Sequence, residues 1–143
     1  NIDITSIKFC TKEMLENYKK INYLYDYIIN KEKELSKHNE NIKNTDLLIN
    51  GRNLTNIGVF RIYVLNYLSN HPKVHSELTR MVRQLAPTEK GLPLELYFFI
   101  NDTIWTEYEK AQSDIFDHLF AVAEYFELKV FQNPSSYDIK KFM

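Results

Sequence analysis

The sequence predicts an α+β domain of the ferredoxin-like βαββαβ class, with a four-stranded antiparallel sheet and helices on one face. Three observations carry this prediction. Apolar residues alternate with a period of two from Leu94 to Ile100, as in a strand that lies on a core. The turn-rich segment 86–93 joins this strand to an earlier one over 78–85. Helical periodicity flanks the hairpin, so the elements follow the order strand, helical segment, strand, strand, helix, strand.

The first half of the chain contains the first strand and an enlarged helical insertion at residues 11–52. Ile2 to Phe9 is the predicted strand, although its alternation slips near Thr5, which indicates a bulge or burial on both sides. Thr11 is a suitable N-cap residue for a following helix. Apolar residues then recur at helical spacing until a polar, asparagine-rich stretch begins at residue 36, so we expect one or two helices and a mobile loop. The apolar positions are Met14, Tyr18, Ile21, Tyr25, Ile28 and Leu35.

The second half contains two more helices and the last strand. A helix is predicted to start at residues 53–56 and to end at His71, because the following proline disfavours helical geometry in the residue before it. Asn101, Asp102 and Thr103 are N-cap candidates for the longest helix. Its predicted buried stripe is Trp105, Tyr108, Gln112, Ile115, Leu119, Val122 and Phe126. Residues 128–132 form the last predicted strand, and 135–143 form a flexible tail.

Composition excludes several classes of function. The 143 residues suit one domain with a substantial core. With 18 basic and 19 acidic residues the formal charge is −1, so we expect no bulk attraction to nucleic acid or anionic lipid. Only 3 glycines argue against phosphate-binding loops. No stretch approaches the roughly 18 apolar residues of a membrane span. The first residue is Asn1 rather than Met, so we expect part of a longer protein.

Residues with potential chemistry have simpler structural explanations. Cys10 is interpreted as a small apolar residue near the end of a strand, and the presence of a single cysteine favours a reducing compartment. His71 and His75 have the spacing of helical metal ligands, but Pro72 breaks the helix between them. Asp114 and His118 share a helix face near Asp117, where a surface hydrogen bond or ion pair suffices. We therefore expect no catalytic residue, cofactor or metal site, and no enzyme activity.

The second strand of the hairpin is apolar on its other face as well. Tyr97 and Phe99 follow Glu95 there, and a strand that is apolar on both sides needs cover on both sides. In ferredoxin-like RNA-binding domains such aromatics stack on bases, but the glycine–aromatic signature is absent here and the chain is slightly acidic. We therefore expect protein to cover these rings, either the helical insertion, the tail or a neighbouring subunit.

Several blocks of sequence resemble the C-terminal cytoplasmic domain of MscS-like mechanosensitive channels, with most likeness to the miniconductance subgroup. The resemblance extends over roughly residues 2–134 and is strongest after Asn53. The insertion at 11–52 departs from the shorter link of small-conductance channels and is similar to that of the miniconductance subgroup. The blocks are Asn53 to Arg61, Met81 to Thr88, Gly91 to Tyr97, Trp105 to Glu109, Gln112 to Leu119, and Val130 to Pro134.

This resemblance implies that residues 1–134 form one cytoplasmic domain of a channel subunit, in a homo-oligomer expected to be a heptamer, in the bacterial inner membrane. The channel would release ions and small solutes under membrane tension during hypo-osmotic shock. The chain itself would be a structural and solute-filtering wall segment, without the pore and with membrane contact only through upstream segments. The resemblance implies neither catalysis nor a cofactor, and no binding of nucleic acid.

In a ring of subunits, we expect an interface at the Tyr97 and Phe99 face or on the Tyr23 and Tyr27 side of the insertion. Two other classes of function stay open. A ligand-sensing regulatory module of the same fold would show a defined pocket with convergent polar groups. An enzyme on this architecture would show a phosphate-binding nest or a paired acid and base, because fold alone never excludes catalysis.

Overall fold

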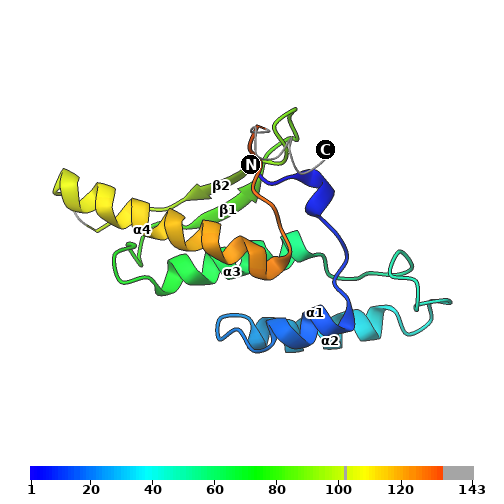
Figure 1. The fold of residues 1–143 in the computed structure, drawn as a ribbon. Helices are drawn as coiled ribbons and strands as arrows, with labels where there is room; N and C mark the ends of the chain where they lie inside the picture. The colour runs from blue at the N-terminus through cyan, green and yellow to red at the C-terminus, as the bar shows by residue number, and fades with distance from the viewer. Residues whose placement is uncertain (102, 134–143) are drawn as a thin grey trace.

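The computed structural model describes residues 1–101 and 103–133, and it combines helices with a small sheet (Figure 1). The predicted α+β class is therefore confirmed. None of the helices in these two ranges has the length and apolar character that crossing a membrane requires. The elements, with η for a 3₁₀ helix, are η1 (Ile4–Ser6), α1 (Lys12–Tyr18), α2 (Tyr25–His38), α3 (Asn56–Asn70), β1 (Met81–Gln84), β2 (Leu94–Tyr97), α4 (Trp105–Ala123) and η2 (Glu124–Phe126).

β1 and β2 form the predicted antiparallel hairpin, with Met81 opposite Tyr97. The regular strands are shorter than the predicted ranges 78–85 and 94–100. Arg80 accounts for part of this difference, because its guanidinium donates hydrogen bonds to three nearby carbonyl oxygens and holds the preceding segment in a bend. These oxygens belong to His75 (3.2 Å), Ser76 (2.6 Å) and Leu78 (3.3 Å).

The predicted strand over residues 2–9 is wrong in its middle, where η1 interrupts it. The side chain of Asp3 causes the interruption, since its Oδ1 accepts a hydrogen bond from the backbone N–H of Thr5 at 2.9 Å. Short polar side chains compete with strand pairing in this way. The slip of the alternation near Thr5 marks the same place.

The first and last predicted strands contribute single bridges instead of regular strands. Ile2 bridges Leu92 on one side and Val130 on the other, both antiparallel. The backbone N–H of Ile2 donates to the carbonyl of Leu92 at 2.7 Å, and that of Asp3 donates to Lys129 at 2.8 Å. The sheet described by the structure has two strands, and the four-stranded ferredoxin-like arrangement stays a prediction.

Two helices begin where the sequence predicted, directly after Thr11 and directly after Thr55. The hydroxyl of Thr11 accepts from the backbone N–H of Met14 at 3.2 Å, and that of Thr55 accepts from Gly58 at 3.2 Å. Each bond satisfies a donor that the first helical turn would otherwise leave unpaired. The insertion contains two helices, and α3 ends before His71 as predicted.

α4 departs from prediction at its beginning. Its N-cap residue is Ile104, without a side-chain cap bond, and of the three predicted caps Asp102 lies outside the described residues. The residues that α4 buries are Ala111, Ile115, Leu119 and Ala123. Trp105 and Tyr108, which were predicted to continue this stripe into the core, are exposed. Figure 1 shows the reason, because the first turns of α4 extend beyond the end of α3.

The insertion packs on the rest of its own chain through α1 and the loop after it. The ring of Tyr18 stacks on Phe126 with a centroid distance of 5.0 Å. The side chain of Asn66 in α3 donates to the carbonyl of Tyr23 at 2.8 Å. Lys19 joins the two inserted helices, since its ammonium lies 2.8 Å from a carboxylate oxygen of Glu16 and 3.0 Å from one of Glu32. The insertion is thus part of the domain's core.

Phe126 is the centre of that core. It is fully buried, and besides Tyr18 it contacts the rings of Phe60 at 5.3 Å and Tyr63 at 5.7 Å. Cys10 lies in the same core, and burial raises the pKa of its thiol to about 12. Chain segments from both ends of the sequence therefore meet at one aromatic cluster.

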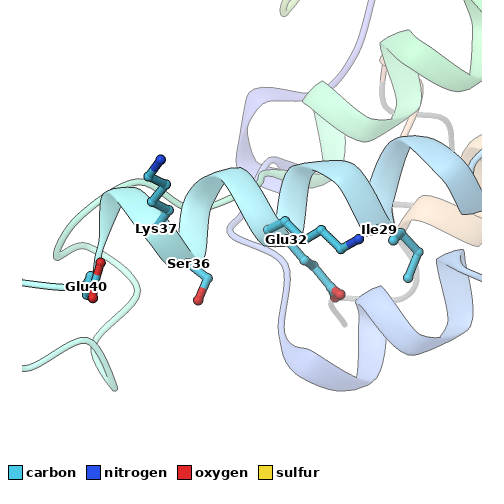
Figure 2. Close-up of a pocket in the computed structure, with 6 residues that line it drawn as sticks. Ile29, Glu32, Ser36, Lys37 and Glu40 are labelled. Carbon is cyan, nitrogen blue, oxygen red and sulfur yellow. The ribbon is translucent and has the colours of Figure 1, made fainter.

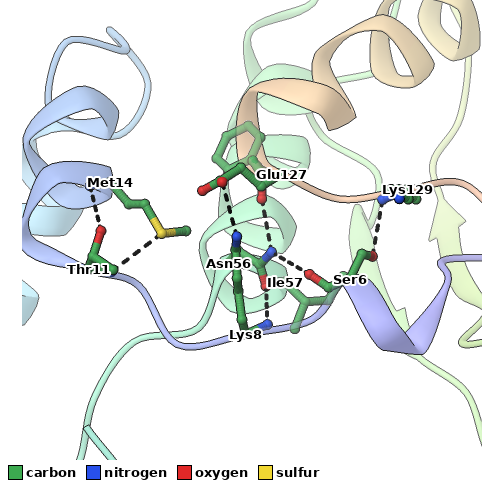
Figure 3. Close-up of polar contacts among 9 residues, drawn as sticks. Ser6, Lys8, Thr11, Met14, Asn56, Ile57, Glu127 and Lys129 are labelled. Atoms are coloured by element: carbon green, nitrogen blue, oxygen red, sulfur yellow. Dashed lines mark hydrogen bonds and ion pairs between the residues drawn. The ribbon is translucent and has the colours of Figure 1, made fainter. Parts of the chain in front are cut away.

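Asn56 holds three segments of the chain together inside the core (Figure 3). Its amide donates to the carbonyl oxygens of Ser6 and Phe126, both at 2.9 Å, and its Oδ1 accepts from the backbone N–H of Lys8 and of Ile57, both at 2.9 Å. The side chain is fully buried, and both its amide nitrogen and its amide oxygen are hydrogen-bonded. Its position at the start of α3 fixes that helix against the N-terminal segment.

Candidate subunit interface

The hairpin presents an open face on the side away from α3. The pairing register places Met81 opposite Tyr97 and Arg83 opposite Glu95, and directly paired residues share one face of a sheet. We call this surface the hairpin face; by register and alternation it consists of Met81, Arg83, Leu85, Glu95, Tyr97 and Phe99. The alternate residues Val82, Leu94, Leu96 and Phe98 pack against the core. Helices therefore cover one side of the hairpin only (Figure 1).

The hairpin face is mostly apolar. Tyr97 is 45% exposed and Phe99 is 40% exposed, and their rings meet edge-to-face at 5.4 Å. Met81 and Leu85 are each 38% exposed beside them. The described chain thus leaves uncovered the two rings for which the sequence predicted protein cover. Contiguous exposed aromatic and aliphatic side chains of this kind are typical of protein–protein contacts.

One ion pair crosses the hairpin face. The Nη2 of Arg83 lies 2.9 Å from Oε1 of Glu95, and its Nε donates to the same oxygen at 3.0 Å. Both side chains are well exposed, so the pair contributes little to stability, about 0.5 kcal/mol. Because the two charges satisfy each other, a partner that covers the face does not leave either of them unpaired.

Gly91 sets the turn that positions the hairpin. Its φ is +99°, a conformation that glycine adopts without the steric cost of a side chain. A Cβ at this position would also collide with the carbonyl oxygen of Ile2. The backbone N–H of Thr88 donates to the carbonyl of Gly91 at 2.9 Å, and the backbone N–H of Gly91 donates to the carbonyl of Thr88 at 3.0 Å. The turn therefore ties the hairpin to the N-terminal segment.

Tyr23 and Tyr27 lie elsewhere, on the α1–α2 side of α3. Tyr23 is 40% exposed, and its ring contacts Tyr63 of α3 at 6.3 Å. Tyr27 is partly buried against the core, and this burial raises the pKa of its hydroxyl. The structure brings Tyr97 and Phe99 together but does not join them to the other pair. An interface at any of the four stays a prediction.

Sequence reasoning missed Met81 and Leu85 as members of the exposed face. The residues were assigned to a strand, but the register of the hairpin was not used to place them. Counting pairs outward from the Thr88–Gly91 turn would have placed Met81 opposite Phe98, one residue away from its partner Tyr97, because the register shifts by one residue between the turn and the two strands.

His118 joins α4 to α3 instead of bonding to Asp114. Its Nε2 lies 2.7 Å from the hydroxyl of Tyr63, and its ring stacks on Tyr67 at 4.2 Å. Burial raises the pKa of Tyr63 to about 12. The ring of His71 contacts the edge of Tyr67 at 5.6 Å, and burial lowers the pKa of His71. These contacts give the imidazoles structural partners.

The turn after α3 does not arrange His71 and His75 as a pair of metal ligands. The Nδ1 of His71 accepts the backbone N–H of Lys73 at 3.1 Å, and Nδ1 of His75 accepts that of Glu77 at 3.2 Å. Each ring thus bonds to its own local turn. Within residues 1–101 and 103–133, no three acidic, histidine or cysteine side chains gather as metal ligands would.

A shallow groove runs along the outer face of α2 (Figure 2). Its lining residues lie on that helix or just after its end and are Ile29, Glu32, Lys33, Ser36, Lys37 and Glu40. Figure 2 shows their side chains spread along the helix, without convergence on one point. A ligand-sensing module would need an enclosed site with convergent polar groups, so this groove does not favour that alternative.

Comparison with known families decides the identity of the domain. Residues 53–129, more than half of the chain, match the family described as "Mechanosensitive ion channel MscS, C-terminal". The chain belongs to the MscS channel family. No solved structure matches the chain. The MscS match includes α3, the hairpin and α4, so the open hairpin face lies inside the family domain, whereas α1 and α2 lie outside the matched range.

Proposed function

We propose that this chain forms a wall segment of the cytoplasmic vestibule of a mechanosensitive channel. The full-length protein would be a homo-oligomer, in the proposal a heptamer, in the bacterial inner membrane. It would open under membrane tension in hypo-osmotic shock and release ions and small solutes. The domain would serve as scaffold and solute filter on the cytoplasmic side, without catalysis or a cofactor and without nucleic acid as a partner.

The open hairpin face is the observation that supports this proposal best. A domain that works alone would cover Tyr97, Phe99, Met81 and Leu85 with its own chain. A subunit in a ring leaves such a surface for its neighbour, and a contact between two different surfaces closes into a ring when the rotation permits. Because the face lies inside the matched range 53–129, its function belongs to the domain shared by the family.

Two finer parts of the proposal concern the fold and the subgroup. The bridges of Ile2 to Leu92 and to Val130 support a four-stranded ferredoxin-like sheet, because they place the N-terminal segment between the residues that lead into β2 and the segment of Val130, in the expected order. The two inserted helices, which precede the matched range, support membership of the miniconductance subgroup.

Patch-clamp recording of the full-length protein tests the proposal. The protein is expressed in cells that lack other mechanosensitive channels, and suction is applied to excised membrane patches. We expect currents that appear above a threshold of suction. Leu85→Asp places a charge on the hairpin face and is expected to abolish these currents, whereas Ile49→Asp, at an exposed position outside the matched range, leaves them unchanged. Patches that never conduct under tension would refute the proposed function.

A further inference from the structure

The beginning of α4 is a second surface that the chain leaves uncovered. We call residues Trp105 to Lys110 the α4 tip; all six are exposed. Trp105 is 74% exposed and Tyr108 is 39% exposed. The indole N–H of Trp105 donates to Oε1 of Glu109 at 2.8 Å, which holds the ring on the helix surface. Burial of α4 against the core begins only at Ala111.

An α4 tip exposed on every side needs a partner. Helical turns gain most of their stability from tertiary packing, and a short stretch without packing is marginal in water. Other exposed rings of this region, Phe120 and Tyr125, belong to turns whose opposite side is packed on the core. Among residues 1–101 and 103–133 the tip has no such support, and it carries the chain's only tryptophan. Tryptophan and tyrosine are the residues that contribute most often to binding energy at interfaces.

The hairpin face is an apolar surface that suits contact with the aromatic side chains of the α4 tip. The hairpin face offers an apolar surface of four side chains, and the α4 tip offers two aromatic rings to place on it. Both surfaces lie within the range that matches the family domain, unlike the exposed Leu47 and Ile49 of the insertion.

Ring geometry requires that two different surfaces meet. If two hairpin faces packed on each other, they would form a closed two-fold dimer, and no face would remain for a third copy. In a ring of more than two copies, each hairpin face must therefore receive another part of its neighbour. Within the described ranges, the α4 tip is the exposed aromatic segment that lacks a packed side.

We propose that the α4 tip of one copy packs on the hairpin face of the next copy, with Trp105 and Tyr108 beside Tyr97 and Phe99. This inference rests on the proposed function, since it needs a ring of identical subunits. The contact repeats around the ring, so every hairpin face and every α4 tip is covered once.

Cysteine cross-linking in the full-length protein tests this contact. The chain's own Cys10 is buried, so introduced cysteines react selectively. Tyr97→Cys and Tyr108→Cys change two exposed side chains and leave the core intact. In membranes treated with a short bifunctional thiol reagent, we expect a chain that carries both changes to give a ladder of dimers, trimers and higher species on denaturing gels. Either change alone is expected to give monomers.

Two controls make the result specific. Chains with Tyr97→Cys co-expressed with chains with Tyr108→Cys should give dimers as the largest linked species in any ring, because each chain then has one reactive position. A chain with Tyr97→Cys and Tyr125→Cys pairs the hairpin face with a more exposed position in η2, past the other end of α4, and it should remain monomeric on the gel.

The outcomes separate this inference from the proposed function. Dimers from Tyr97→Cys alone would show that two hairpin faces meet and would overturn the inference. A double variant that stays unlinked, although native mass measurement shows an oligomer, would also overturn it while leaving the channel proposal intact. A monomeric native protein would refute both.

Discussion

The aromatic core around Phe126 and the hairpin contain the same kinds of residue, but these residues are buried in the core and partly exposed in the hairpin. In the core, Phe126 and Ile28 are fully buried, and the one buried polar side chain among the described residues, Asn56, makes four hydrogen bonds. In the hairpin, Tyr97 and Phe99 remain well exposed. The core is closed by its own chain, and the hairpin is closed on one side only.

The difference shows which apolar surfaces the described chain covers by itself and which it leaves exposed. Several chain segments, from Ile2 to Leu128, supply the core, so its apolar side chains pack against one another within the chain. The hairpin has helices on one side, and the described residues leave its other side exposed. If this comparison is right, substitutions in the core will change stability, and substitutions on the hairpin face will change assembly.

The largest effect is expected from Phe126→Ala. The change empties the centre of a fully buried cluster of three aromatic contacts, so the free energy of unfolding should fall by about 3–5 kcal/mol. The neighbouring residue is a matched control: Tyr125 is 75% exposed, and Tyr125→Ala should change stability by less than about 0.5 kcal/mol. Urea unfolding followed by circular dichroism measures both. Equal losses would contradict the assignment of Phe126 to the core.

Asn56→Ala should follow, with a loss of about 3 kcal/mol, because it leaves the carbonyl oxygens of Ser6 and Phe126 and the N–H of Lys8 without partners in the core. Asn66 in the same helix makes one bond at an exposed site, so Asn66→Ala should cost about 1 kcal/mol or less. The same unfolding experiment compares them. A cost for Asn56→Ala no larger than that for Asn66→Ala would show that the three segments are not held by this amide.

Gly91→Ala tests the link between the two regions. The new methyl group would sit at a positive φ and against the carbonyl of Ile2, so we expect a loss of about 1–3 kcal/mol. Lys90→Ala, at the adjacent exposed turn position, should be nearly neutral. Thermal unfolding of the two variants gives the comparison, and an unchanged midpoint for Gly91→Ala would contradict the close approach of Ile2.

Alkaline pH should weaken the core through Cys10. Burial raises the pKa of the folded thiol to about 12, whereas the unfolded thiol ionises near its ordinary value. The unfolded chain therefore loses its proton first, and stability falls as pH rises through the interval between the two values, by about 1 kcal/mol at pH 10. Unfolding measured at pH 8 and pH 10 should show a smaller decline in Cys10→Ala. An identical decline in both proteins would exclude this contribution.

The smallest effect on folding is expected from Tyr97→Ala. The ring is exposed and contacts Phe99, so stability should change by no more than about 0.5 kcal/mol. Association between copies should weaken by at least about tenfold if the ring is central to an interface. Equilibrium sedimentation and urea unfolding measure the two quantities separately. A variant that loses stability but assembles normally would reverse the comparison.

Local sequence determined the helix starts and the hairpin. Thr11 and Thr55 cap helices where the pattern placed them, and Pro72 ends α3, because a cap or a proline acts within a few residues of itself. The alternation from Leu94 predicted both a strand and the need to cover its second face. The blocks after Asn53 identified the family. The same reasoning failed for the first strand, where one side chain, Asp3, turned the backbone.

Tertiary structure alone decided which apolar stripes are buried and which are left open. The stripe of α4 reads continuously from Trp105 to Phe126, yet only the part that lies over α3 is covered, because burial requires a second element at the same place in space. Asn56 looked like a helix-start residue, and only the fold brought Ser6, Lys8 and Phe126 around it. Sequence periodicity describes one element at a time, whereas burial depends on pairs of elements.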